Sequence, residues 1–308
     1  MSELVSVIVP TYRRPDRLRR ALDSINAQTY NNIEIIVVDD NSPEDEYRKE
    51  TETFIRQYSS SLPLKYVRMA QNEGGAMARN RGISEAAGTF ITFLDDDDEY
   101  LPDKIEKQIN KFDVSQFSHL GLVYCQINFM DNRGRFRKMR APMYACGNRE
   151  ALEKHMIRNL APTSGLMIPK KVLDKVGGFA DLLTGHEYEL ILRILARGYN
   201  ADYNTEALVN MHYHTSGRIS TSRKKIRGEK ALFHLKKNYF PLIGKKLAKR
   251  VSYIHFMDLC KRYNQQDDRR ASLIYLKKAC QMDPLKVYTL LSYSGILADE
   301  MLKKIIQR

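Results

Sequence analysis

The chain has 308 residues, of which 43% are hydrophobic and 28% are charged, and these values exclude a disordered chain, a collagen and a coiled-coil rod. No apolar run approaches the roughly 18 residues that a membrane-spanning helix needs, and we expect no signal peptide at the start of the sequence. Residues 1–216 carry 28 Lys and Arg against 30 Asp and Glu, whereas residues 217–308 carry 22 against 7, a net charge of +15. This basic excess predicts that the C-terminal third contacts phosphates, in nucleic acid, on an anionic membrane surface or on a substrate.

Residues 1–100 alternate short β-branched runs with amphipathic segments. We expect strands at residues 5–9, 33–38, 64–69 and 89–94, and helices at residues 15–28, 44–58 and 75–87. Such alternation predicts a parallel sheet with helices on both faces, in which ligands bind beyond the carboxyl ends of the strands. Polar clusters follow three of these strands, so the fold rule alone brings the clusters to one edge.

The rest of the chain is less regular. We expect strands at residues 119–130 and 207–211, helices at residues 148–158, 169–176 and 187–196, and helix from about residue 222 onward. Four cysteines occur, but none forms a C-x-x-C pair or a cluster with the spacing of a zinc site. We therefore expect reduced thiols in a cytoplasmic protein.

The strand at residues 89–94 runs directly into four aspartates, Asp95 to Asp98. Adjacent carboxylates repel one another, and a divalent cation relieves that repulsion. Ligand sets made of oxygen suit Mg²⁺ or Mn²⁺. The alternative is a solvated acidic loop, or the cap of a helix that starts near Pro102.

Two further groups of polar residues lie at the same expected edge. Asp39 ends the strand at residues 33–38, where a carboxylate can accept from a base N–H or a ribose hydroxyl, although helix capping by the residues that follow is the alternative. Arg79 lies on the helix before the aspartates, and its planar guanidinium suits a diphosphate. The alternative for Arg79 is an ordinary exposed helix arginine.

Glu187 stands at the start of an amphipathic helix. A carboxylate in a cleft can act as a general base, but an acid at this position can also be a favourable partner of the helix dipole. His212 and His214 share one face of an extended segment, so one of them could complete a metal shell that already contains a carboxylate.

With these residues identified, the chain resembles the family 2 glycosyltransferases over residues 3–230. The five matching segments, in order, are SVIVPTY at 6–12, VVDDNS at 37–42, ARNRG at 78–82, FLDDDD at 93–98 and VGGF at 176–179. The resemblance implies a GT-A fold at residues 1–220, with a nucleotide-binding half at about 1–100 and an acceptor half at about 101–220. A mainly parallel sheet flanked by helices belongs to this fold, and residues 221–308 would form a basic α-helical appendage.

The resemblance also implies an inverting transfer from a nucleoside-diphosphate sugar, most often a UDP-sugar, to a hydroxyl of a glycan or lipid-linked acceptor. This chemistry serves the synthesis of surface polysaccharides and glycoconjugates. The nucleotide contacts that it implies are Pro10, Thr11, Tyr12, Asp39, Arg79, Asp95 and Asp96. The implied ligands of Mn²⁺ or Mg²⁺ are Asp97 and His214, with Asp96 as an alternative to Asp97.

The catalytic base of the family lies in a Glu-Asp pair at a helix start, where this chain has His186 and Glu187. We expect Glu187 to be the base, with Glu189 and Asp181 as fallbacks. The basic helices could hold the enzyme against the inner face of a membrane that carries the acceptor.

Three other functions compete with sugar transfer. A nucleic-acid-binding protein would explain the basic C-terminal region but not the aspartates, and we expect no nucleic acid partner. A nucleotidyltransferase on a similar scaffold would normally have a glycine-rich loop where this chain has Pro10 to Arg14. A protein that binds nucleotide sugar without turnover is the third, because His186 departs from the acidic pair of the family.

Overall fold

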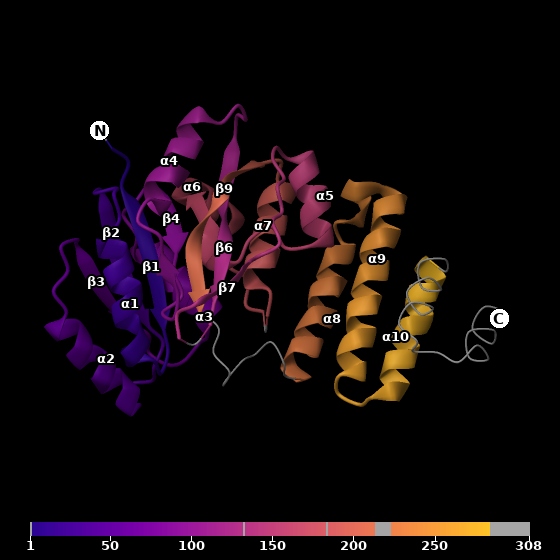
Figure 1. The fold of residues 1–308 in the computed structure, drawn as a ribbon, viewed down its shortest axis with the longest axis horizontal. Coiled ribbons are helices and arrows are strands. Elements are labelled where there is room, and N and C mark those ends of the chain that lie inside the picture. Colours follow the sequence, from indigo (N-terminus) through magenta and orange to yellow (C-terminus); the bar gives the residue numbers. More distant parts are fainter. Residues whose placement is uncertain (1, 132, 183, 213–222, 284–308) are drawn as a thin grey trace. The chain divides into compact units, whose positions relative to one another are not determined.

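The computed structural model describes residues 2–131, 133–182, 184–212 and 223–283. The chain divides into two compact units, residues 1–218 and 219–308. The first unit is a sheet with helices packed against it, and the described part of the second is helical (Figure 1).

The sheet of the first unit has nine strands in the order β3-β2-β1-β4-β8-β6-β9-β5, with β7 paired to β6. The strands are β1 (Val5–Thr11), β2 (Ile33–Asp39), β3 (Leu64–Arg68), β4 (Phe90–Phe93), β5 (Glu99–Tyr100), β6 (Leu120–Met130), β7 (Phe136–Met139), β8 (Leu166–Pro169) and β9 (Asn200–His212). The first four pair with one another in parallel, as the alternation predicts, and β6 and β9 are parallel as well. Strand β8 joins the two parallel groups by pairing antiparallel with both β4 and β6.

Helices follow most of these strands. Those of the first unit are α1 (Pro15–Asn26), α2 (Glu46–Gln57), α3 (Gly75–Glu85), α4 (Lys104–Val114), α5 (Arg149–Ile157), α6 (Lys170–Val176) and α7 (His186–Ala196), with a short 3-10 turn at Thr163–Gly165. Six of the seven lie where the sequence predicts helix, to within a few residues at each end, whereas α4 lies where the sequence suggests a helix, near Pro102, only as part of an alternative.

Alternate residues of β1 pack against different helices. Val5, Val7 and Val9 belong to a core cluster that includes the apolar face of α1 and residues of α4. Ile8 points to the other face, where a Cβ at Gly82 of α3 would overlap its side chain. The sheet is therefore buried on both faces at its centre, as continuous apolar strands require.

The described part of the second unit consists of α8 (Arg223–Lys237), α9 (Phe240–Asn264) and α10 (Arg269–Met282). Tyr253 of α9 packs with Leu276 and Ala279 of α10, and the ring of His255 stacks on Phe233 at 4.0 Å. No helix among the described residues is long and apolar enough to cross a membrane. The cysteines at 125, 146, 260 and 280 are all free thiols.

Candidate functional site

The polar clusters that follow β1, β2 and β4 meet at one edge of the sheet, as predicted. Thr11 is the register partner of Asp39, because β1 and β2 end side by side. The hydroxyl of Thr11 donates to Oδ2 of Asp96 at 2.8 Å. The aspartate run after β4 therefore contacts the end of β1, whose other neighbour is the end of β2.

Asp39 is fully buried and its carboxylate is already engaged. Oδ1 accepts from the backbone N–H and the side-chain amide of Asn41, each at 2.8 Å, and Oδ2 accepts from the Tyr66 hydroxyl and lies 3.3 Å from Nε of Arg48. Burial raises the pKa of Asp39, and the hydrogen bonds from Tyr66 and Asn41 oppose that rise. An N–H group of a nucleotide base would have to displace one of these partners to reach the carboxylate of Asp39.

Asp40 anchors the segment that leads into α3. Its carboxylate accepts from the backbone N–H groups of Glu73 and Gly74, at 2.9 and 2.8 Å, and from the Asn72 amide at 3.0 Å. Three bonds from one short segment hold the N-terminus of α3 next to the end of β2. This contact fixes the helix on which Arg79 lies.

The ring of Tyr12 is 40% exposed at the end of β1, and the guanidinium of Arg13 lies 5.2 Å from its centre. Arg13 adopts the left-handed conformation (φ 54°), and its backbone N–H donates to Oδ1 of Asn41 at 2.9 Å. Pro10, one residue before Thr11, is partly exposed. The turn therefore leaves an aromatic face open beside the ends of β1 and β2.

The four aspartates have different partners. Asp95 pairs with Arg79 of α3, whereas Asp97 pairs with Arg14 at 2.8 Å and lies 3.5 Å from Arg17. Asp98 is buried, and it accepts from the Ser164 hydroxyl at 3.2 Å and from the His212 backbone N–H at 3.1 Å. The run therefore connects α3, the region of α1 and the end of β9.

Burial and neighbouring carboxylates act together on Asp96 and Asp98, the two buried members of the run. Burial, and after it the charge of Asp97, raises the pKa of Asp96 to about 7. Burial and the charges of Asp95 and Asp97 also raise the pKa of Asp98 well above its ordinary value. A positive charge placed near this run would relieve the repulsion.

The donor chemistry of the run fits Mg²⁺ or Mn²⁺, since all four side chains offer carboxylate oxygens. Asp95 and Asp97 are both paired with arginines, however, and no three metal-ligating side chains converge within the described part of the chain. His214 lies outside the described residues. His212 lies within them, but its Nε2 faces Oε1 of Glu99 at 3.2 Å and does not complete a ligand set with the run.

Arg79 pairs with Asp95 of the aspartate run, and His186 precedes the expected base in the chain. Arg79 is 11% exposed at its side chain, and one of its terminal nitrogens donates to the Gly75 carbonyl at 3.1 Å. Burial, and after it the charge of Arg79, lowers the pKa of His186. Within the described residues, neither Nε2 of His186 nor Nε of Arg79 has a hydrogen-bond partner, and both atoms are buried.

Glu187 is held by a residue that the sequence interpretation did not identify. Its Oε1 accepts from the side-chain amide of Asn159 at 3.0 Å. Asn159 follows α5 and lies 28 positions from Glu187, so no local spacing connects them. The fallback Glu189 is 4% exposed and pairs with Arg193, whose guanidinium also donates to the carbonyls of Val176 and Gly178. Asp181, the other fallback, is exposed.

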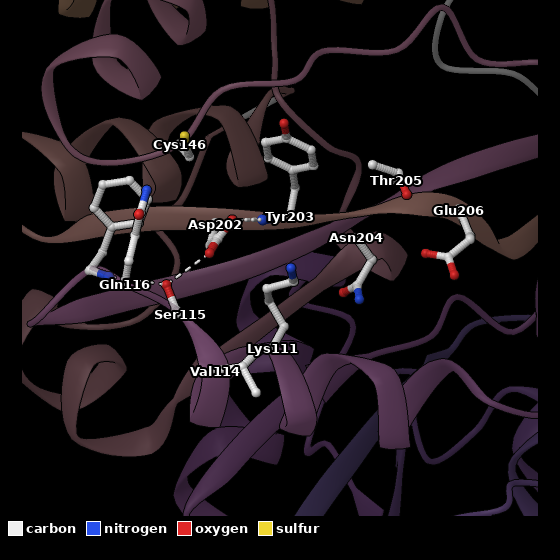
Figure 2. Close-up of a pocket in the computed structure, with 11 residues that line it drawn as sticks. Lys111, Val114, Ser115, Gln116, Cys146, Asp202, Tyr203, Asn204, Thr205 and Glu206 are labelled. Carbon is white, nitrogen blue, oxygen red and sulfur yellow. Dashed lines mark hydrogen bonds between the residues drawn. The ribbon is translucent and has the colours of Figure 1, made fainter.

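A separate pocket lies away from these residues, at the start of β9 and the end of α4 (Figure 2). The Ser115 hydroxyl donates to Asp202 at 2.8 Å across it. None of the predicted site residues lines this pocket. It lies toward the other end of β9 from His212, the residue of that strand that contacts the aspartates.

In sequence, this chain is similar to known glycosyltransferases. The sequence model described as Glycosyl transferase family 2 matches residues 6–177. An uncharacterized glycosyltransferase of Rickettsia typhi is 31% identical over 235 residues, covering 75% of this chain and 71% of that protein. The amylovoran biosynthesis glycosyltransferase AmsB of Erwinia amylovora is 27% identical over 234 residues, covering 75% and 76%.

Solved structures share the fold. Residues 1–349 of TarS from S. aureus, in complex with UDP-GlcNAc, give a TM-score of 0.58 at 18% identity and cover 90% of each chain. The mannosyltransferase PcManGT from Pyrobaculum calidifontis, in complex with GDP-Man and Mn²⁺, gives a TM-score of 0.64 at 17% identity, covering 97% of this chain and 81% of that one. At these identities the likeness concerns the fold.

Proposed function

This chain belongs to glycosyl transferase family 2 and is a glycosyltransferase with the GT-A fold, and we propose that it performs a metal-dependent, inverting transfer from a nucleoside-diphosphate sugar. The observation that carries the proposal is a series of interactions through the site. Thr11 donates to Asp96, Asp95 pairs with Arg79, and the charge of Arg79 acts on His186, which precedes Glu187 in the chain. A donor bound at the aspartates would therefore lie on the side of Arg79, and Glu187 would approach it from the helix that His186 begins.

On the donor side, the ring of Tyr12 stacks on the nucleotide base, and Thr11 and Asp39 lie beside Tyr12. Arg79 donates to the diphosphate, because a planar guanidinium matches phosphate oxygens. Asp95 and Asp96 bind the ribose of the nucleotide and the groups next to it. UDP is the expected nucleotide, and binding of UDP-GlcNAc by TarS supports it, while the GDP-Man complex of PcManGT makes GDP the alternative.

On the acceptor side, Glu187 accepts the proton of the attacking hydroxyl. The hydroxyl oxygen forms a bond to the anomeric carbon while the bond from that carbon to the diphosphate breaks on the opposite face, which inverts the configuration. The residues that would hold Mn²⁺ or Mg²⁺ are Asp97 and His214. Such an ion neutralises charge on the departing diphosphate.

We also propose that the second unit contacts an anionic membrane at its cytoplasmic face, where a lipid-linked acceptor of polysaccharide synthesis would be found. The first half of α9 exposes Lys245, Lys246, Lys249 and Arg250. Among the described residues these four have no ion-pair partner, and Leu242 beside them is 46% exposed. Basic side chains next to an apolar one suit an anionic lipid surface, and sedimentation with vesicles with and without phosphatidylglycerol tests this contact.

The donor proposal is tested by thermal shift with UDP-, GDP- and dTDP-sugars, each with and without Mn²⁺. We expect one nucleotide to raise the melting temperature only when Mn²⁺ is present, and we expect Asp97→Asn to remove the shift. A shift that is unchanged in Asp97→Asn would contradict the metal site. Donor binding without any sugar transfer, across glycan and lipid-linked acceptors, would instead support a nucleotide-sugar-binding protein without turnover.

A further inference from the structure

Two arginines near the proposed base, Arg140 and Arg158, each donate to backbone carbonyls that follow the other arginine in the chain. Arg140 follows β7 and donates to the carbonyls of residues 159 and 160, at 2.7 and 2.9 Å. Arg158 ends α5 and donates to the carbonyls of residues 141 and 142, at 3.1 and 2.8 Å. Because each guanidinium reaches the segment that carries the other, the two positive charges lie close together.

Asn159 connects this arginine pair to the base. Its carbonyl accepts from Arg140, and its side-chain amide donates to Glu187. The amide oxygen of Asn159 is buried and has no hydrogen-bond partner among the described residues. Asn159 therefore connects Arg140 to the proposed base through two hydrogen bonds.

The arginine pair lacks the counter-charge that neighbouring arginines have. In the β6–β7 hairpin, Arg135 and Arg137 both pair with Asp131, at 3.0 and 3.2 Å. Within the part of the chain that the structure describes, no carboxylate lies within 4.0 Å of Arg140 or Arg158.

The pKa of Arg140 also reflects the lack of a counter-charge beside the two arginines. Burial, and after it the charge of Arg158, lowers the pKa of Arg140, while Glu187 acts in the opposite direction. Among the described residues, Glu187 is the carboxylate that opposes this shift at Arg140. A bound anion would supply the second negative charge.

We propose that the acceptor carries an anionic group, a carboxylate or a phosphate, that binds Arg140 and Arg158 while its attacking hydroxyl lies at Glu187. The inference rests on the proposed sugar transfer and names the class of acceptor. Guanidinium groups bind carboxylates and phosphates through paired N–H groups, which fixes the orientation of the bound molecule. The unused N–H groups of Arg158 provide such a pair, since only one of its terminal nitrogens donates within the described protein.

The test measures binding of three probes that differ only at one carbon: glucose, glucuronic acid and glucose 6-phosphate. Titrations are made with UDP and Mn²⁺ at saturating concentration, so that the phosphate of a probe cannot enter the donor subsite. We expect the wild-type protein to bind glucuronic acid or glucose 6-phosphate about tenfold more tightly than glucose, as a charge-assisted contact would give. Preference for the carboxylate or for the phosphate identifies which anion the acceptor carries.

Variants separate the anion contact from a structural role. Arg158 is exposed, so Arg158→Gln is expected to fold and to lose the preference, and Arg158→Lys is expected to retain part of it. The matched control is Arg149→Gln, because Arg149 lies exposed on the same helix and pairs with Glu153. We expect this control to bind the three probes as the wild type does.

Equal affinity of the wild type for all three probes would overturn the inference, as would a preference that survives in Arg158→Gln. UDP affinity is measured in the same variants and is expected to stay unchanged. Failure of UDP to bind at all would count against the proposed donor and not against the anion site, so the two failures are distinguishable.

Discussion

A terminal nitrogen of Arg14 lies 2.8 Å from Oδ2 of Asp97, the carboxylate proposed to hold the cation. The same guanidinium lies 3.4 Å from Asp96, and Arg17 lies 3.5 Å from Asp97. Arg14, which precedes α1, and Arg17, which lies on it, therefore occupy the electrostatic position that a divalent cation would take. Metal binding at Asp97 and the pairing with Arg14 compete for one carboxylate.

Removal of this competitor is expected to strengthen metal binding. Partly exposed ion pairs contribute about 0.2–1 kcal/mol, so Arg14→Gln is expected to lower the Mn²⁺ concentration for half-maximal transfer by up to about fivefold. Arg19→Gln is the control, because Arg19 lies on α1, the helix that begins directly after Arg14, with its guanidinium against the rings of Phe54 and Tyr58. A higher Mn²⁺ requirement in Arg14→Gln would mean that Arg14 supports the cation site instead of competing with it.

Loss of the proposed base is expected to affect chemistry and to spare donor binding. Glu187→Gln keeps the shape of the side chain and removes its capacity to take a proton, so we expect kcat to fall by about 10²- to 10⁴-fold. The affinity for UDP, measured by calorimetry, should remain that of the wild type. An equal loss of both quantities would indicate a structural role for Glu187.

Glu189, two positions after Glu187, is expected to affect the stability of the fold and not the chemical step. Its buried pairing with Arg193 also fixes the segment that includes Val176 and Gly178. Removal of one partner from a buried pair costs about 3–5 kcal/mol, so Glu189→Ala should unfold at markedly lower urea concentration. Wild-type stability with lost activity would transfer the role of base to Glu189.

Asn80 clamps the VGGF segment at residues 176–179. Its amide oxygen accepts from the Phe179 N–H at 2.7 Å, and its amide nitrogen donates to the Phe179 carbonyl at 2.8 Å. Loss of both bonds should cost about 1–3 kcal/mol, and urea unfolding of Asn80→Ala measures it. The exposed Asn110→Ala is the control and should differ from the wild type by less than about 0.5 kcal/mol.

The clamp formed by Asn80 also requires glycine at position 178. Gly178 has φ 66°, and a Cβ there would overlap the amide oxygen of Asn80. Gly178→Ala is therefore expected to be destabilised even with Asn80 intact. Wild-type stability of Gly178→Ala, in the same urea measurement, would contradict the clamp.

The elements that could be predicted from the sequence are those with a local pattern. β1 and β2 are β-branched runs, and the rule that parallel strands end at one edge places Thr11 beside Asp39 and the aspartates. β8 has four residues, buried throughout, which is too short for a period to be recognised, and the first part of β9 is polar and partly exposed. The antiparallel pairing of β8 with β4 and β6 therefore could not be predicted from the sequence.

The partners of the site residues were the part that could not be predicted. Arg14 and Asp97 lie 83 positions apart, and Asn159 lies 28 positions from Glu187. Arginines are frequent in this chain, so residue type does not single out the one that meets a given carboxylate. Only the tertiary structure brings such residues together, because the sheet order, not the chain order, makes β8 the neighbour of β4.

Lys104 is a buried cation that the proposed reaction does not use. Its side chain is 0% exposed, its ammonium group donates to the Thr92 hydroxyl, and it lies 4.1 Å from the centre of the Tyr100 ring. Burial lowers the pKa of Lys104 to about 7, and the nearby Cys125 opposes the shift. The folded protein therefore holds this amine in its neutral form at alkaline pH.

The pKa of lysine in an unfolded chain is about 10.4, so between pH 7 and that value the unfolded state binds more protons than the folded state at this position. Stability rises with pH wherever the unfolded state binds more protons, here by up to about 1.4 kcal/mol per pH unit. Lys104→Met removes this dependence. We expect the variant to exceed the wild type in unfolding free energy at pH 7, and its advantage to shrink at pH 8 and pH 9, measured with urea.

Lys107→Met is the matched control on the same helix. Lys107 is paired with Asp103 at 2.7 Å and Glu206 at 3.0 Å, and hydrogen bonds to these carboxylates raise its pKa. A lysine whose pKa is raised stays charged in both states from pH 7 to pH 9, so the difference between this variant and the wild type should not depend on pH. A difference for Lys104→Met that is equally independent of pH would mean that the buried amine keeps its proton in the folded protein.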